Sequence, residues 1–333
     1  MKNLLKAGAM IAFVSFIYLP FAYSAEEMRF GTMAPEGSSW YNILKEFTKG
    51  VENKTNKEVK FKIYAGTLGD EKTILKRMRA KKLEGAGFTG IGLGEIYPGI
   101  RILEQPMLFR NYEEVDFVTE KIWTYLEKKF EEQGFVLLGR GEAGFVNLFT
   151  NKPVKEEADF QGIKLWVWEG DPVAKGLVDV FGIVPIYLSL PDVLTALQTN
   201  RIDACYAPPL AAMAFQWHTK VKFYTDIPLA NSIGAMVVTK ESFDKLNAEQ
   251  QEVMKKYGWA AGKKIVQTSR RDNKRAYEEL EKMGIKKVDV QKSDYEKIEK
   301  AGLRVRKSLV GKLYNQEMLD LVEGYLREYR KGK

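Results

Sequence analysis

The chain carries two kinds of hydrophobic pattern that follow one another. Residues 27–33 and 59–65 place apolar and polar side chains in turn, as half-buried strands do, whereas residues 38–56 and 69–84 carry apolar side chains at helical spacing. The order strand, helix, strand, helix is typical of an α/β layer with a largely parallel sheet. We therefore predict such a layer at the start of the chain.

The same rhythm returns in the middle of the chain. The strand-like segments there are FVLLGRG, VNLFTN, GIKLWVW, VPIYL and RIDACYA, and helices are expected over 171–181 and 191–198. Trp166 and Trp168 lie two positions apart in GIKLWVW, so both indoles share one face of that strand. The sequence thus predicts a second α/β unit with two indoles on one strand face.

Residues 248–283 contain no proline and fit one helix that starts after Asn247 and stops before Gly284. At about 1.5 Å per residue such a helix is roughly 54 Å long, which is more than the width of one small domain. Its two ends carry apolar residues, and its middle, QTSRRDNKR, is polar. We expect a strut that packs on both α/β units and crosses the hinge between them.

Residues 1–24 have the features of a secretory signal peptide. Lys2 and Lys6 precede the apolar run AGAMIAFVSFIYLPF, and AYS before Ala25 fits a cleavage site near Ser24/Ala25. The run is shorter than the roughly 20 residues of a membrane span and is broken by Pro20. We expect an exported, soluble product rather than a membrane-spanning one.

The remaining composition argues against several function classes. The formal net charge is +8, but the basic residues are scattered, whereas a nucleic-acid binder gathers them on one face. Cys205 and His218 are the only residues of their types, so we expect no disulfide, no metal site and no nucleophile–base pair for catalysis. We interpret Cys205 as a small buried hydrophobe and His218 as a surface or structural residue, and we predict a protein that is not an enzyme and needs no cofactor.

GAGFTG matches the dinucleotide-binding fingerprint at Gly85, Gly87 and Gly90, but its surroundings are wrong. The fingerprint needs a strand before the glycines and a helix after them. Here a basic helix precedes the glycines, and the strand-like stretch 101–109, RILEQPMLF, follows them. We interpret the glycines as sites of close backbone packing.

Two α/β units, a helix across the hinge and no catalytic apparatus are typical of a receptor that closes on a ligand. Three segments then make the chain resemble the solute receptors of tripartite ATP-independent periplasmic (TRAP) transporters, the DctP-like family. They are LGDEKTILKRM (68–78), GIKLWV (162–167) and DVLTALQTNRIDACYAPPLAA (192–212). The family patterns are LGxExxxLxxLxxGxxD, GxKxR and ALQTGxVDGxExP.

The resemblance implies a two-lobed periplasmic binding protein fold with a hinge cleft and a long helix spanning both lobes. It implies a periplasmic receptor that closes on a small molecule and delivers it to the small and large TRAP membrane subunits. The expected divisions are 1–24 for the signal peptide, 25–143 and 232–271 for lobe one, and 144–231 and 272–333 for lobe two.

The positions that the family uses for ligand binding are altered in this sequence. The arginine of GxKxR, which pairs with a ligand carboxylate, falls at Trp166, a second arginine falls near Val146, and an asparagine falls at Pro208. In the sialic-acid branch, further contacts would fall at Met33, Thr89 and Leu190. The chain thus resembles an atypical branch that lacks the usual carboxylate-binding arginine.

A carboxylate buried without its cation costs several kcal/mol, whereas apolar area removed from water contributes roughly 25 cal/mol per Å². We therefore hypothesise a hydrophobic or aromatic ligand. The residues expected to hold it are Trp166, Trp168, Val146, Leu190, Met33, Trp40 and Tyr206.

Three alternatives stay open. An organic acid could pair with a non-standard cation, first of all Arg140 near the hinge, and Glu142 could pair with a polar end of the ligand. A quaternary ammonium could bind to the aromatic faces. The protein could also be a carrier or sensor that hands an apolar ligand to another protein.

Trp217 and Trp259 lie on helical stretches and are expected in the core.

Overall fold

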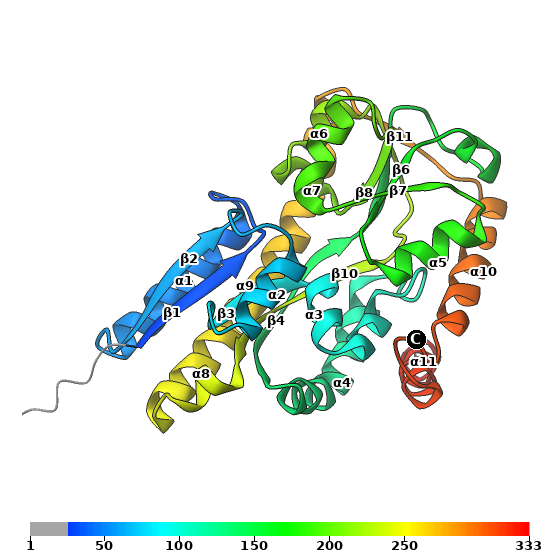
Figure 1. The fold of residues 1–333 in the computed structure, drawn as a ribbon. Coiled ribbons are helices and arrows are strands. Elements are labelled where there is room, and N and C mark those ends of the chain that lie inside the picture. The colour runs from blue at the N-terminus through cyan, green and yellow to red at the C-terminus, as the bar shows by residue number, and fades with distance from the viewer. Residues whose placement is uncertain (1–25, 333) are drawn as a thin grey trace, which may run out of the picture.

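Two lobes, each built on one sheet, make up the computed structural model, which describes residues 26–332 (Figure 1). The strand order of the first sheet is β2-β1-β3-β10-β4, with β10 antiparallel to both of its neighbours. In that order its strands are Val59–Ala65, Glu26–Thr32, Gly85–Thr89, Asn231–Thr239 and Phe135–Phe145.

The second sheet has the order β11-β9-β5-β8-β6-β7. In that order its strands are Lys286–Val288, Phe223–Thr225, Asn147–Thr150, Ala204–Ala207, Leu165–Trp168 and Pro185–Leu188. β6 runs parallel to β7 and β8, whereas β5 is antiparallel to β8 and β9. We refer to the layers built on the first and second sheets as lobe one and lobe two.

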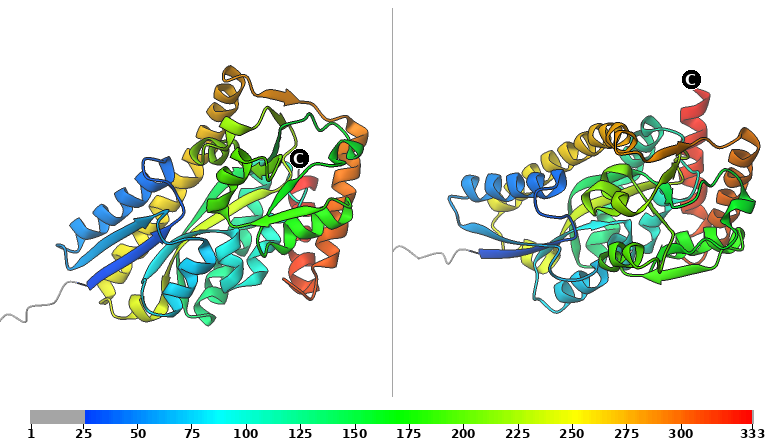
Figure 2. Two further views of the ribbon diagram at one scale, coloured as in Figure 1. Left: turned by 45° about the horizontal axis from the view of Figure 1, so that its top comes forward. Right: turned by 90° about the horizontal axis from the view of Figure 1, so that it is seen from above.

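Helices cover both sheets (Figures 1 and 2). Lobe one carries α1 (Ser39–Lys54), α2 (Glu71–Arg79), α3 (Gly90–Ile96), η1 (Pro98–Glu104), α4 (Tyr112–Glu132) and α8 (Lys240–Asp244). Lobe two carries η2 (Glu157–Phe160), α5 (Pro172–Val180), η3 (Leu190–Asp192), α6 (Val193–Gln198), α7 (Pro209–Ala214), η4 (Trp217–Lys220) and α10 (Lys292–Ser308).

Two expectations from the sequence around the glycine segment were wrong. Gly85 and Gly87 lie inside strand β3 and the short helix α3 starts at Gly90, so a helix does follow the glycines. Residues 98–104 form the 3-10 helix η1 instead of a strand, with Pro98 in its first turn. The packing interpretation fits Gly85, where a Cβ would lie 2.0 Å from the ring of Phe30, but not Gly87, where the nearest atom would be 3.6 Å away.

The long helix is confirmed as α9 (Ala248–Lys282). Asn247 and Gln250 form a capping box at its start, and Gly284, at φ +89°, follows its end. Its first half lies on β4 at backbone contact: a Cβ on Gly258 would lie 2.7 Å from the Leu138 carbonyl oxygen. The helix continues past lobe one to lobe two (Figures 1 and 2).

The chain crosses between the lobes near residues 146, 230 and 273. Val146 donates its N–H to the carbonyl of Ala230, and Leu229 donates to Val146, so two crossings are hydrogen-bonded to each other. On α9, the Asn273 amide donates to the carbonyl of Ala143 and accepts from the N–H of Leu210. These contacts tie the three crossings together. The chain returns to lobe one once more, between α10 and the final helix.

The final helix, α11 (Gln316–Lys331), packs on α4 of lobe one. Arg330 pairs with Glu114 at 2.7 Å and donates to the Leu108 carbonyl, and the rings of Phe117 and Tyr329 are 5.2 Å apart. This helix lies in the range 272–333 that the sequence assigned to lobe two. The residue boundaries of the lobes stay a prediction.

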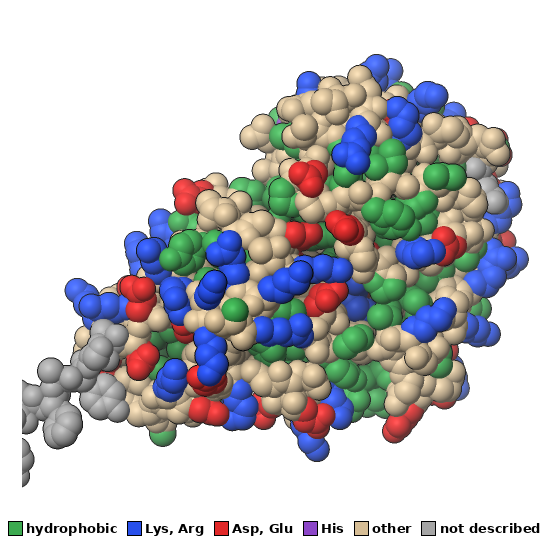
Figure 3. All heavy atoms as spheres, viewed as in Figure 1, with side chains coloured by type: hydrophobic (Ala, Val, Ile, Leu, Met, Phe, Trp, Pro, Cys, Tyr) green, Lys and Arg blue, Asp and Glu red, His purple; other side chains and the backbone are tan. Residues whose placement is uncertain are grey.

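On the face seen in Figure 3, lysine and arginine side chains are spread over both lobes and mixed with acidic ones. Within residues 26–332, no helix has the length and apolar character needed to cross a membrane.

Candidate functional site

A cavity of about 320 Å³ lies between the two lobes, and its walls are mainly apolar. The volume is in the range of small-molecule sites. Nine of the residues singled out from the sequence line this cavity: Met33, Trp40, Thr89, Val146, Trp166, Trp168, Leu190, Tyr206 and Pro208. The structure thus brings together, from both lobes, positions that lie far apart in the sequence.

Trp166 is the centre of an aromatic group in the cavity wall. Its ring stacks on Tyr206 with centroids 4.9 Å apart, meets Trp217 edge-on at 5.2 Å, and lies 6.0 Å from Trp168. Its indole nitrogen donates to the Leu188 carbonyl at 3.0 Å, so the buried polar atom is satisfied. The position where the family expects an arginine is therefore filled by a fixed indole, which is 1% exposed and packs against three other rings.

The second indole links the lobes. Trp168 donates its Nε1–H to Asp70 of lobe one at 3.0 Å, and its backbone N–H donates to the hydroxyl of Tyr206. Of the two tryptophans expected in the core, Trp217 is buried and lines the cavity, whereas Trp259 is 43% exposed on α9.

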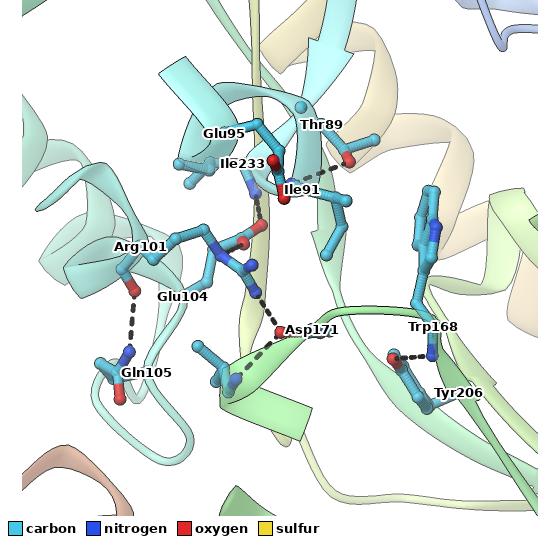
Figure 4. Close-up of polar contacts among 12 residues, drawn as sticks. Thr89, Ile91, Glu95, Arg101, Glu104, Gln105, Trp168, Asp171, Tyr206 and Ile233 are labelled. Atoms are coloured by element: carbon cyan, nitrogen blue, oxygen red, sulfur yellow. Dashed lines mark hydrogen bonds and ion pairs between the residues drawn. The ribbon is translucent and has the colours of Figure 1, made fainter. Parts of the chain in front are cut away.

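Arg101 is a buried cation inside the cavity and is already neutralised by the protein (Figure 4). Its Nη2 lies 2.8 Å from the carboxylate of Asp171, and its Nε lies 2.7 Å from that of Glu104. Arg101 and Glu104 belong to lobe one, whereas Asp171 is the N-cap of α5 in lobe two. The lobes are therefore joined by an ion pair whose side chains are only 6% and 7% exposed.

Burial and charge act in opposite directions on these groups. Burial lowers the pKa of Arg101, but the carboxylates of Asp171 and Glu104 outweigh it and raise that pKa. Burial raises the pKa of Glu104, although Arg101 and the N–H of Ile233 stabilise its charged form. A Cβ on Gly90 would lie 1.9 Å from the Glu104 carboxylate, so this glycine makes room for it.

Glu71 is a second buried acid in the cavity wall. It accepts hydrogen bonds from the N–H and hydroxyl of Thr89 and from the N–H of Gly92. Burial nevertheless raises the pKa of Glu71 to about 7, because three hydrogen bonds do not fully replace water around the charge. The cavity thus holds more acidic than basic side chains.

Arg140, the cation first suspected from the sequence, lies outside the main cavity. Its guanidinium pairs with Asp116, which Arg270 also contacts at 2.7 Å. Arg270 in turn holds Glu142 at 2.6 Å, so Glu142 has its own cation although it lines the cavity. Arg140 is therefore not part of this cavity, whose buried cation is Arg101, and a ligand-binding role for Arg140 stays a prediction.

No catalytic or metal-binding arrangement is found among residues 26–332. Cys205 is fully buried, and burial raises the pKa of its thiol, which works against a thiolate nucleophile. The Nδ1 atom of His218 lies 3.2 Å from the carbonyl oxygen of Ala212. No three acidic, cysteine or histidine side chains in this range are grouped so that they could hold a metal ion. What this site can do chemically is enclose a ligand.

The sequence contained signals for the residues that were missed. Arg101 and Glu104 interrupt the apolar run IRILE, and charges inside an apolar run are buried only when paired. Glu71 occupies the acidic position of LGxE, which served only to recognise the family. Asp171 precedes Pro172 and was covered by a helix prediction alone. Pairing of Asp171 with Arg101 requires the tertiary fold.

Known proteins resemble the chain over most of its length. The model of the family "bacterial extracellular solute-binding protein, family 7" (DctP) matches residues 30–312. The 2,3-diketo-L-gulonate-binding periplasmic protein of Escherichia coli is 26% identical over 242 residues, which are 72% of this chain and 74% of that protein.

Two solved structures show the same fold. A TRAP periplasmic solute binding protein from Ralstonia eutropha, with bound (S)-2-acetolactate, has a TM-score of 0.85 at 21% identity and covers 91% of this chain and 99% of its own. One from Haemophilus influenzae, with bound L-gulonate, has a TM-score of 0.84 at 22% identity, with the same coverage of both chains.

Proposed function

Because this chain belongs to the bacterial extracellular solute-binding proteins of family 7, it is a periplasmic receptor of the TRAP type and not an enzyme, and we propose that its ligand is hydrophobic or aromatic. The family implies a small-molecule ligand and membrane subunits that receive it. We further propose that residues 1–24, which lie outside the described residues, are the cleavable signal for export.

The proposed ligand class rests on the charge balance around the buried cation Arg101. Arg101 faces the cavity, but Asp171 and Glu104 already supply two carboxylates to it. A ligand carboxylate at Arg101 would be a third carboxylate beside one guanidinium, and if it displaced either of the two present, that one would be left buried without a partner at a cost of about 3–5 kcal/mol. The aromatic surface of Trp166, Trp168 and Tyr206 instead favours apolar groups.

The relatives support a competing candidate. The related proteins bind 2,3-diketo-L-gulonate, acetolactate and L-gulonate, which are organic acids. An acid bound at Arg101, the buried cation, would compete with Asp171 for it, whereas Lys155 and Lys297 are the other cations of the cavity lining. The two candidates therefore differ in whether the Arg101–Asp171 pair stays intact when the ligand is bound.

Native mass spectrometry of the exported protein, purified from a periplasm and followed by organic extraction, tests the ligand class. We expect a lipid-like or aromatic molecule to co-purify and expect gulonate not to raise the melting temperature. A bound polar carboxylate would overturn the proposal and would make Arg101 the cation that replaces the missing arginine.

A pair of matched variants tests the cavity itself. Trp166→Ala removes the central ring and should weaken binding of the extracted molecule at least about tenfold, because burying an aromatic side chain contributes roughly 1.5–3 kcal/mol. Trp259→Ala removes an exposed indole outside the cavity and should leave affinity unchanged. Equal affinity of both variants, each checked for folding by circular dichroism, would remove Trp166 from the site.

A further inference from the structure

The cavity continues beyond the aromatic cleft into the interior of lobe two, and we propose that this extension binds the hydrocarbon chain of an elongated ligand. We call it the lobe-two chamber; its walls include Leu165, Val167, Ala174, Val178, Phe181 and Ile183. The inference rests on the proposed hydrophobic ligand and specifies its shape.

The strand pattern of β6 shows that cleft and chamber are different places. Trp166 and Trp168 point to one face of the sheet, and Leu165 and Val167 point to the other. All four line the same cavity. β6 pairs with β8 only at Leu165, so one space can reach both faces of β6 where the sheet opens beside it or past its end, after which Asp171 of the cavity lining follows.

The chamber is a space between packed elements of lobe two. α5 supplies Ala174 and Val178, and it packs closely on α10, where a Cβ on Gly176 would lie 3.0 Å from Val305. The inward side chains of α5 are apolar, and its exposed Lys175 and Asp179 pair with each other instead. An uncharged, narrow space of this kind suits a hydrocarbon.

Four polar residues of the cavity lining form what we call the polar rim. Lys155, Glu156, Asp294 and Lys297 belong to the cavity lining, and Lys297 pairs with Asp294 at 2.8 Å. Between this rim and the aromatic cleft, the buried charge of Arg101 is neutralised by Asp171. The path from cleft to rim therefore leads from one face of β6 to the other and bends, and its walls are mainly apolar. A flexible chain can follow such a bend, whereas a rigid fused ring system of the same volume cannot.

The test is a series of primary alcohols from butanol to dodecanol, titrated into the full exported protein by calorimetry. Each added CH₂ that enters the chamber should tighten binding about fourfold, as burial of a methylene predicts. Ala174→Phe fills the chamber and should stop this gain at a shorter chain, while butanol binding, which needs only the cleft, stays unchanged. Phe181→Ala enlarges the chamber and should move the end of the gain to a longer chain.

Ala260→Phe is the matched control, because Ala260 is exposed on α9 and does not line the cavity. If the wild type shows the fourfold steps and neither chamber variant changes where they end, the chain does not enter lobe two and this inference fails, while the proposed ligand class stands. If no alcohol binds the wild type at any length, the proposed hydrophobic ligand itself fails.

Discussion

Asp171→Asn separates the charge of the inter-lobe ion pair from its shape. Asparagine has the volume of aspartate and is an equally good N-cap, so the hydrogen bond from the N–H of Val173 that starts α5 is kept. The variant removes only the negative charge that lies 2.8 Å from Arg101.

The size of the effect follows from burial. Breaking a buried pair by removing one partner costs about 3–5 kcal/mol. Glu104 still neutralises Arg101 in the variant, so we expect the lower end, about 3 kcal/mol, or roughly a hundredfold change in an equilibrium constant. The loss falls on the closed form alone, since the pair joins the two lobes.

Two assays measure this change. X-ray scattering of the ligand-free variant should show a larger radius of gyration than the wild type, and calorimetry should show affinity for an apolar ligand reduced by up to about a hundredfold. Asp179→Asn is the control, because it breaks an exposed pair with Lys175 on the same helix, and such pairs contribute only about 0–1 kcal/mol.

The reasoning is refuted if Asp171→Asn and Asp179→Asn have the same scattering curves and the same affinities. A double-mutant cycle of Asp171→Asn with Arg101→Gln tests the same ion pair independently. Partners in one buried pair should show a coupling of at least about 0.5 kcal/mol, whereas additive effects would mean that the contact does not hold the lobes together.

Two further predictions concern the acids of the cavity wall. The pKa of Glu71 is raised to about 7 from an ordinary 4.5, so its contribution to folding is present at low pH and is lost as pH rises through 7. In urea titrations, the unfolding free energy of the wild type relative to Glu71→Gln should fall by about 3 kcal/mol between pH 4.5 and 7.5. Parallel pH profiles of the two proteins would contradict this. Gly90→Ala places a Cβ 1.9 Å from the Glu104 carboxylate and should destabilise the protein by about 1–3 kcal/mol in thermal unfolding. Gly87→Ala is the control, because its Cβ would lie 3.6 Å from the nearest atom, and it should leave the stability unchanged. Equal stability of the two variants would mean that Gly90 is not needed to make room for Glu104.

Local patterns predicted most of the fold. The helix over 248–283 had caps, length and no breaker, and it appears as one element, Ala248–Lys282. The alternating strand 59–65 was also placed correctly. The segment 101–109 was not, because its apolar residues suit a strand, whereas packing against neighbouring elements selected the 3-10 helix η1.

The site was less accessible from the sequence than the fold. The family alignment found residues such as Trp166 and Leu190, because motif spacing fixes which strand or helix end they occupy. It could not find the neutralisation of Arg101, since Asp171 is 70 residues away and the two meet only when both lobes are in place. Arg140 of strand β4 is expected near the hinge from the sequence, but it pairs with Asp116 of helix α4.

The close approach of α9 to β4 has a mechanical consequence. With Gly258 and Gly262 against the backbone of β4, the first half of the helix is clamped to lobe one and can neither slide nor roll. Lobe two is attached to the other half of the helix. Asn273 accepts a hydrogen bond from the N–H of Leu210, and Tyr277 donates one to the side chain of Asn147. A beam clamped along half its length responds to load at its free end only by bending. Separation of the lobes therefore requires α9 to bend between its two attached halves.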